Sequence, residues 1–346
     1  MGETANYDYN AFKKGSEDNS NYYEMLNTHE RSAAFFANGT YSYKGKYIVN
    51  GTARYEGTNK LGKSRQALWL PTWNVSTAWN AHEEQFMKDI YPYVSHLSLK
   101  ASYSLTADRG PSSVTNSAVV IGSETPWRPF TSVRETMLYI EDLANTDLTY
   151  EKKKELNLGL ESGFFDNRVN FAIDWYTRDN YDLIGVINTQ GMGGQVEKFG
   201  NIATMKSNGY EISLSTQNIK KKDFNWTTNF IYSHSHNEVT SLKTTTRVIT
   251  LITGNGFAQE GYPVRGIFSI PFVGLNDQGL PVFKDQDGNE AVTGVYFQES
   301  DNLDFLEYSG NADPTDVGSL GNIFKWKGLS LNVFVTYSCG NVIRLD

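Results

Sequence analysis

The stretch that most constrains the fold is LGLESGFFDNRVNFAIDWY at residues 158–176, where apolar and polar residues alternate in two runs. The second run places four large apolar residues on one face: Val169, Phe171, Ile173 and Trp175. A corner at residues 163–167 separates the runs, so the pattern predicts a β-hairpin. The alternation leaves open whether the apolar face packs on a protein core or contacts lipid.

Similar alternation predicts about ten strands along the chain. They are expected at 33–43, 47–56, 66–79, 95–106, 150–162, 168–186, 204–217 and 224–237, with a last hairpin around a turn at 327–328. These segments run about 10–14 residues, whereas strands of globular proteins are typically about 5–6 residues long. A tilted strand that crosses a membrane needs about 9–11 residues.

The connections between these strands alternate in length. One set is short or compact: 44–46, 80–94, 163–167, 218–223 and 327–328. The other set is nearly always longer: 57–65, 107–149, 187–203 and 238–321. Short turns at one rim and long loops at the other are typical of outer-membrane β-barrels, so we expect the apolar faces to contact lipid.

Overall composition narrows the function classes. A net charge of −8 and a pI near 5.3 argue against binding to nucleic acid. Cys339 is the single cysteine, which excludes a disulfide framework and a cysteine zinc site. No apolar run approaches the roughly 20 residues of a membrane helix. The first residues are polar and lack the apolar core of a signal peptide, so we expect either a cytoplasmic protein or a chain that starts partway into a longer one.

Several blocks together resemble the C-terminal barrel half of SusC/RagA-type TonB-dependent outer-membrane transporters. The first is LTYE at 148–151 with the hairpin that follows it. Further blocks occur in the family's order: GKYIVNGTARYEG (45–57), LPTWNVSTAWNAHEEQFMKD (70–89), GNIATMKSNGYEISLS (200–215), FNWTTNFIYSHSHNEV (224–239), GLNDQGLPVFKDQDGN (274–289) and GSLGNIFKWKGLSLNVFVTYSCGN (318–341).

The resemblance implies an all-β fold, an antiparallel up-and-down portion of a 22-stranded transmembrane barrel. It implies import of an oligosaccharide or a peptide across the outer membrane of a Gram-negative bacterium, without enzymatic chemistry or a cofactor. The implied partners are a SusD-like surface lipoprotein, the TonB complex and membrane lipid. The family's plug and TonB-contacting parts have no counterpart here, so we expect an internal fragment, with a polar segment at 1–30 and a partial barrel at 31–346 that carries long extracellular loops.

Candidate sites are few, and each has an ordinary structural alternative. His234 and His236 share one strand face, a spacing that can bind Zn²⁺, but no third ligand is near in sequence. Residues 285–290 resemble the start of a Ca²⁺ loop, but the glycine is misplaced and an exposed turn is the better interpretation. His82-Glu83-Glu84 lacks the second histidine of a zinc protease motif, so we expect Asn80 to cap a short helix there.

The loop at 126–134 carries the only residues that we assign to substrate: Trp127, Arg128 and Phe130. Exposed aromatic rings can stack on sugars and arginine can pair with carboxylates, although these residues can equally anchor the loop. Polar residues of the strand at 95–106 are expected to line the lumen: Ser98, Lys100, Ser102 and Ser104.

Two other functions remain open at this point. A soluble secreted β-protein, such as a carbohydrate-binding module or adhesin, has no reason to keep long strands or alternating connection lengths. A glycosidase needs two carboxylates at a defined separation, and no motif singles out such a pair.

Overall fold

The structure, a computed structural model, describes residues 31–59, 68–110, 119–124, 137–145, 147–191, 197–244, 246–254, 256–293 and 302–344. Residues Ser32–Asp346 form one compact unit. No helix within the described ranges is long and apolar enough to cross a membrane.

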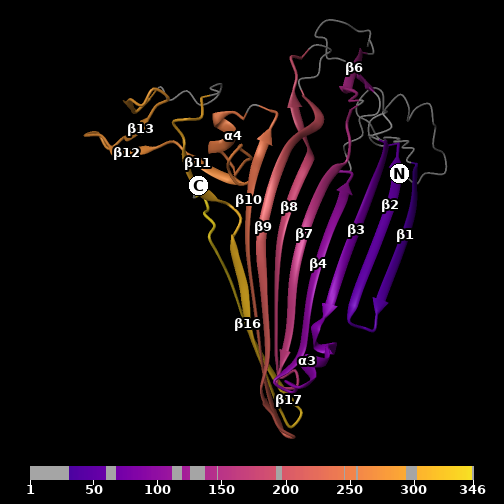
Figure 1. The fold of residues 1–346 in the computed structure, drawn as a ribbon. Coiled ribbons are helices and arrows are strands. Elements are labelled where there is room, and N and C mark those ends of the chain that lie inside the picture. Colours follow the sequence, from indigo (N-terminus) through magenta and orange to yellow (C-terminus); the bar gives the residue numbers. More distant parts are fainter. Residues whose placement is uncertain are drawn as a thin grey trace, which may run out of the picture. The chain divides into compact units, whose positions relative to one another are not determined.

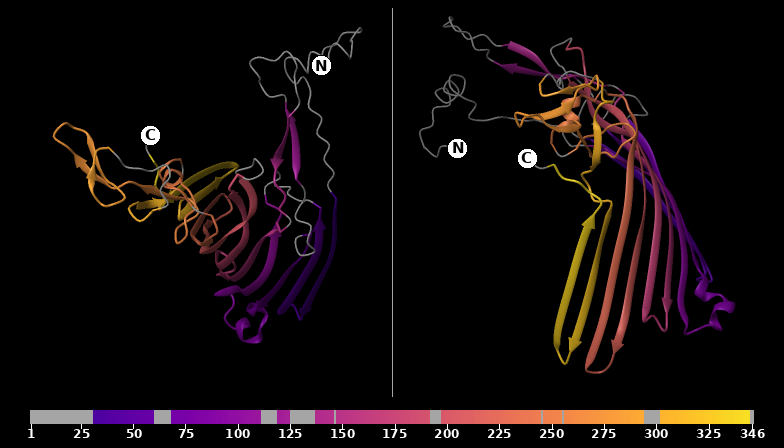
Figure 2. Two further views of the ribbon diagram at one scale, coloured as in Figure 1. Left: turned by 90° about the horizontal axis from the view of Figure 1, so that it is seen from above. Right: turned by 90° about the vertical axis from the view of Figure 1, so that its left-hand side faces the viewer.

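Ten long strands form one antiparallel sheet (Figure 1). They are β1 (Ser32–Tyr43), β2 (Tyr47–Thr58), β3 (Trp69–Asn80), β4 (Val94–Asp108), β7 (Glu151–Phe164), β8 (Val169–Asn188), β9 (Glu197–Lys220), β10 (Phe224–Leu242), β16 (Asp316–Trp326) and β17 (Leu329–Cys339). Each strand pairs with the strand before and after it in this order, so the sheet follows the up-and-down topology that the sequence predicts. Figure 2 shows that the sheet is curved rather than flat.

The predicted alternation of connections is confirmed. One side of the sheet, here called the turn side, has connections at 44–46, 81–93, 165–168, 221–223 and 327–328. The opposite side, here called the loop side, has connections at 59–68, 109–150, 189–196 and 243–315. The tight turns use left-handed backbone, with φ of 53° at Lys44 and 45° at Lys327, each followed by a glycine.

The strands differ from the prediction mainly on the loop side, where β9 and β10 are much longer. β9 has 24 residues and β10 has 19, because both continue past the alternating segments into less regular sequence. Their pairing absorbs a register shift between Val239 and Ser241. A local irregularity of this kind lets a strand continue where the alternation of side chains breaks.

The two longest connections hold more structure than predicted. The region 107–149, predicted to be irregular, contains a hairpin of β5 (Val120–Glu124) and β6 (Met137–Asp142). The excursion at 243–315 contains a short helix and two small sheets. Its elements are α4 (Val248–Ile252), β11 (Gly266–Ser269), β12 (Phe272–Leu275), β13 (Pro281–Lys284), β14 (Glu290–Ala291) and β15 (Glu307–Asn311).

A small hydrophobic cluster lies at the loop side, where β7 begins. Leu148 and Tyr150 are fully buried and pack with Leu70 of β3. Asn201 of β9 ties the same segment down, because its amide donates to the carbonyl oxygen of Thr149 at 2.9 Å and its Oδ1 accepts from the Thr149 N–H at 2.9 Å. The LTYE block at 148–151 therefore fastens the connection before β7 onto the sheet.

Candidate functional site

The sheet has one predominantly apolar face. Backbone pairing places Tyr47, Trp79 and Leu99 in a single row across β2, β3 and β4. The same row continues through Leu160, Ile173, Ile212, Tyr232, Gly318 and Tyr337 to β17. Four side chains of this row are exposed, namely Tyr47, Trp79, Leu99 and Tyr337; Leu99, for example, is 40% exposed.

The apolar residues of this face form a band that changes height from strand to strand. On β2 the band runs from Tyr47 to Tyr55, and on β17 it runs from Leu329 to Tyr337. Tyr47 is the turn-side end of its run, yet it shares a row with Tyr337, the loop-side end of the other. The band therefore shifts by eight residues (Leu329 to Tyr337) over the eight steps from β17 to β2, or one residue per strand.

This shift measures the tilt of the strands against the band. A rise of about 3.3 Å per residue and a separation of about 4.8 Å between strands give a tilt of about 35°. Outer-membrane barrels have strands tilted by about 35–45° and an apolar band about 25 Å tall. Eight residues along a strand at this tilt span about 22 Å of band height. The apolar face thus has the geometry of a barrel surface that contacts a bilayer.

The opposite face of the sheet is polar. On β1 and β2 the amide of Asn38 donates to Thr52 at 2.7 Å, and Thr40 donates to Asn50 at 3.2 Å. Farther along the sheet, Glu155 of β7 accepts from Arg178 of β8 at 3.0 Å. The sequence prediction placed four residues of β4 on this face: Ser98, Lys100, Ser102 and Ser104. Backbone pairing sets them opposite Asn80, Ala78, Ser76 and Asn74 of β3, in rows that alternate with the apolar rows.

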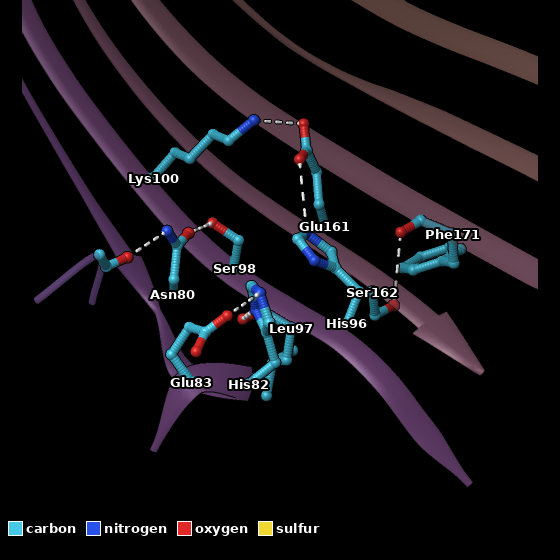
Figure 3. A network of polar contacts seen from close by, with 11 residues as sticks. Asn80, His82, Glu83, His96, Leu97, Ser98, Lys100, Glu161, Ser162 and Phe171 are labelled. Carbon is cyan, nitrogen blue, oxygen red and sulfur yellow. Dashed lines mark hydrogen bonds and ion pairs between the residues drawn. The ribbon is translucent and has the colours of Figure 1, made fainter. Parts of the chain in front are cut away.

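Near the turn side, the polar face carries a network of side chains (Figure 3). Ser98 donates to Asn80 at 3.1 Å, and Lys100 forms an ion pair with Glu161. The His82 and His96 rings lie 4.3 Å apart, and His96 Nε2 is 4.0 Å from Glu161. These groups join the connection at 81–93 to the polar face of β4 and β7.

A shallow groove of about 480 Å³ follows the same face from β4 to β17. Its polar lining is mostly uncharged and includes His96, Asn170, Ser213, Ser215, Asn229 and Ser319. The described residues contain no group of three or more histidine, cysteine or acidic side chains that could hold a metal ion. The groove therefore offers hydrogen-bonding groups, which suit contact with a polar surface or solute.

His234 and His236 lie on one strand face, as predicted, but that face is the apolar one. His234 Nδ1 lies 2.9 Å from Asp316 of β16, and the Tyr232 hydroxyl donates to the same carboxylate at 2.5 Å. This cluster marks the loop-side edge of the band on β10. The polar groups bond to one another there, as buried or lipid-facing charges require.

The acidic turn at 285–290 has a structural role. Asp285 Oδ1 accepts hydrogen bonds from the backbone N–H of Asp287 at 3.0 Å and of Asn289 at 2.8 Å. This is an Asx turn, which connects β13 to β14. The geometry agrees with the expected exposed turn.

The predicted helix cap at Asn80 is wrong. Its side chain donates to the Gly45 carbonyl oxygen at 2.7 Å and does not cap a helix. The segment forms a 3₁₀ turn, η1 (Ala81–Glu83), and one helical turn, α3 (Gln85–Lys88), and neither has a side-chain cap. The tertiary contacts of Asn80 with the neighbouring turn outweigh the local capping preference.

Glu84 joins the turn-side connections, a role that the sequence did not predict. Its carboxylate accepts from Lys46 Nζ and from the Tyr47 hydroxyl, each at 2.7 Å. The hydrogen bond from Lys46, followed by that from Tyr47, lowers the pKa of Glu84, and Glu84 raises the pKa of Lys46. No local sequence pattern connects Glu84 with residues almost forty positions away.

Replacing Glu84 with glutamine should lower the thermal unfolding midpoint in a pH-dependent way. A lowered carboxyl pKa stabilises the fold above the ordinary value of 4.5, and this contribution is lost as pH falls through the lowered pKa. The raised pKa of Lys46 keeps its contribution until pH rises above 10.5. The loss of thermal unfolding midpoint in E84Q should therefore be largest between pH 4.5 and pH 10.5 and should shrink in acid. D89N, which changes an exposed carboxylate of the same connection, is the control; an equal deficit in D89N would contradict the assignment.

The substrate candidates Trp127, Arg128 and Phe130 lie outside the described residues. Four Asn-X-Ser/Thr sequences lie within strands: those at Asn38, Asn50, Asn74 and Asn225.

Comparison with known proteins agrees with this geometry. Residues 1–340 match the family model described as TonB dependent receptor-like, beta-barrel. The TonB-dependent receptor P3 of Formosa agariphila is 25% identical over 331 residues, covering 89% of this chain and 32% of that protein. SusC of Bacteroides thetaiotaomicron is 26% identical over 218 residues, covering 62% of this chain and 21% of that protein.

Among solved structures, the RagAB peptide importer in its closed-closed state has a similar fold. The TM-score is 0.73 at 22% identity, and the match covers 90% of this chain and 33% of that one. The outer-membrane transporter YddB of Escherichia coli gives a TM-score of 0.51 at 14% identity, with 89% and 33% of the two chains covered. The chain therefore spans about a third of the length of the P3 receptor and of these two solved chains.

Proposed function

Because the chain belongs to the TonB-dependent receptor-like β-barrel family, we propose that it forms a wall section of a transporter that imports an oligosaccharide or a peptide. The family consists of outer-membrane transporters, not enzymes. Transport proceeds by binding and gated passage, so the residues described here bind, line or support without a covalent step. The observation that carries the proposal is the apolar band, which shifts by one residue per strand.

In this proposal the apolar face contacts lipid and the polar face borders the lumen. The long connections at 107–149, 187–203 and 238–321 lie on the outer side of the membrane, and the short turns lie in the periplasm. A SusD-like lipoprotein covers the loop side, and the TonB complex supplies energy through other parts of the transporter. A peptide importer among the solved neighbours and SusC among the relatives support these partner classes.

A soluble adhesin is the weaker alternative. It would expose the rows of tyrosine, leucine and valine of the apolar face to water, and soluble proteins rarely expose apolar patches of more than a few hundred Å².

Deleting the gene that encodes this chain should abolish growth on one nutrient from a panel of oligosaccharides and peptides supplied singly. Restoring the gene should restore growth, and dissipating the proton-motive force should stop uptake of the same labelled nutrient. Unchanged uptake of every nutrient, with the chain recovered in the water-soluble fraction, would contradict the proposal.

We also propose that Trp127, Arg128 and Phe130 contact the substrate. Trp127→Ala should reduce uptake of that nutrient at limiting concentration, because an aromatic ring can stack on a sugar or a peptide side chain. Trp127→Phe keeps a ring and should retain most of the uptake. Equal uptake by the alanine variant and the unsubstituted protein would remove these residues from the site.

A further inference from the structure

The connection at 81–93 crosses the turn-side rim from one face of the sheet to the other. At its start, the His82 ring lies beside His96 on the polar face, with ring centroids 4.3 Å apart. Two residues later, Glu84 bonds to Tyr47, which belongs to the apolar face. Trp79, also of the apolar face, makes the smallest of the contributions that lower the pKa of Glu84. The helical turn α3 therefore begins at the turn-side end of the apolar band.

The rest of this connection is held firmly against the next turn. The backbone N–H of Phe165 donates to the Tyr93 carbonyl oxygen at 3.2 Å, and that of Asp166 donates to the Pro92 carbonyl oxygen at 3.3 Å. The Tyr91 hydroxyl donates to the Asp166 carboxylate at 2.9 Å. Side chains that project from this segment are therefore presented at a fixed height on the rim.

Those projecting side chains are large and apolar. Phe86 is 63% exposed and Tyr93 is 69% exposed, although Met87 between them is buried. The set of exposed apolar side chains at this rim, here called the rim patch, comprises Phe86, Ile90, Tyr91, Tyr93 and Phe165. Lys88 is exposed on α3 beside it.

We propose that the rim patch rests in the headgroup region of a phospholipid leaflet and anchors the turn side of the sheet there. The inference rests on the proposed function, because it takes the apolar band as the lipid-facing surface. The patch continues that band: Glu84 bonds to Tyr47 of the band and directly precedes α3, which carries Phe86. Aromatic residues, tyrosine especially, gather at membrane–water interfaces, where a lysine beside them keeps its cation in the polar layer.

The arrangement also explains why Glu84 is needed. A tyrosine hydroxyl and an ammonium group at the edge of hydrocarbon both require a partner. Glu84 supplies one from the chain itself, so the band can end there without leaving a donor unsatisfied. Phe86, two residues after Glu84, is then an exposed side chain at the turn-side end of the band.

The test is a collision measurement on spin labels, made in outer-membrane vesicles with the protein produced from its natural gene. With Cys339 replaced by serine, single cysteines are placed at Phe86, at Ile90, at Val49 within the band and at Asp223 in another turn. Each label is exposed to oxygen, which concentrates in lipid, and to a water-soluble nickel chelate. We expect labels at Phe86 and Ile90 to collide more often with oxygen and less often with the nickel chelate than a label at Asp223 does. Their collision rates should approach those of the label at Val49.

Two results would overturn the anchor while leaving the proposed function intact. In one, Val49 is lipid-exposed but Phe86 and Ile90 are as nickel-accessible as Asp223. In the other, both labels are shielded from both reagents, which would mean that a protein covers the rim patch. A nickel-accessible label at Val49 would instead overturn the proposed function itself.

Discussion

A lysine at Leu99 is expected to reduce the amount of assembled protein in the outer membrane far more than a lysine at Ser102. Leu99 lies on the apolar face of β4, in one row with Trp79 and Leu160, and is 40% exposed. A cation on the lipid face costs about 2–4 kcal/mol at the bilayer midplane and less toward the interfaces, and Leu99 lies between the turn-side end of the band and its middle. Since proteins are only marginally stable, a loss of this size is expected to deplete the folded form.

Ser102 is the matched control for this experiment. It lies on the same strand, opposite Ser76 and Asn157, on the polar face. There a lysine can reach water or a polar partner, so little loss is expected. The measurement is the heat-modifiable fraction of each variant in isolated outer membranes. Equal amounts of the two variants would show that the two faces have been assigned wrongly.

Truncation of Leu148 to alanine is expected to destabilise the loop side of the sheet by about 2–5 kcal/mol. Leu148 is fully buried and packs with Tyr150 and Leu70, and Ala107, Ile184 and Phe199 pack against this cluster. The cavity should free the connection before β7, which Asn201 otherwise holds by hydrogen bonds to Thr149.

Amide exchange should detect this change as faster exchange at residues 148–150 and at 197–203, with the turn side unaffected. Leu148→Met nearly conserves volume and should cost less than about 1.5 kcal/mol. Similar exchange rates in the alanine and methionine variants would indicate that the cluster contributes little to the fastening of this connection.

The sequence predicted the long strands and their order, because side-chain alternation and connection length can be read from the sequence without knowing the tertiary contacts. The ten strands, the antiparallel barrel portion and the SusC/RagA resemblance are confirmed by the topology and the family match. The small strands β5, β6 and β11–β15 were missed, since segments of two to six residues are too short to show a period.

The slant of the band could not be predicted, because it depends on register. Nothing in the two separate stretches indicates that Tyr47 and Tyr337 share a row; eight consecutive strand pairings are needed to establish it between β2 and β17. The role of Glu84 depends in the same way on the turn at 44–46 lying beside residues 81–88. Local capping chemistry pointed to Asn80, whose side chain bonds to Gly45 across that same contact.

The depths of Tyr47 and Tyr337 in the membrane test the central claim most directly. Spin labels at these two positions, with Cys339 replaced by serine, can be located by collision with oxygen and with a nickel chelate. The two residues share one hydrogen-bonded row, yet the one-residue shift per strand predicts that Tyr47 lies at the turn-side surface of the bilayer and Tyr337 at the loop-side surface. Equal depths for the two labels, or free access of the nickel chelate to the middle of either run, would contradict a tilted, membrane-spanning sheet.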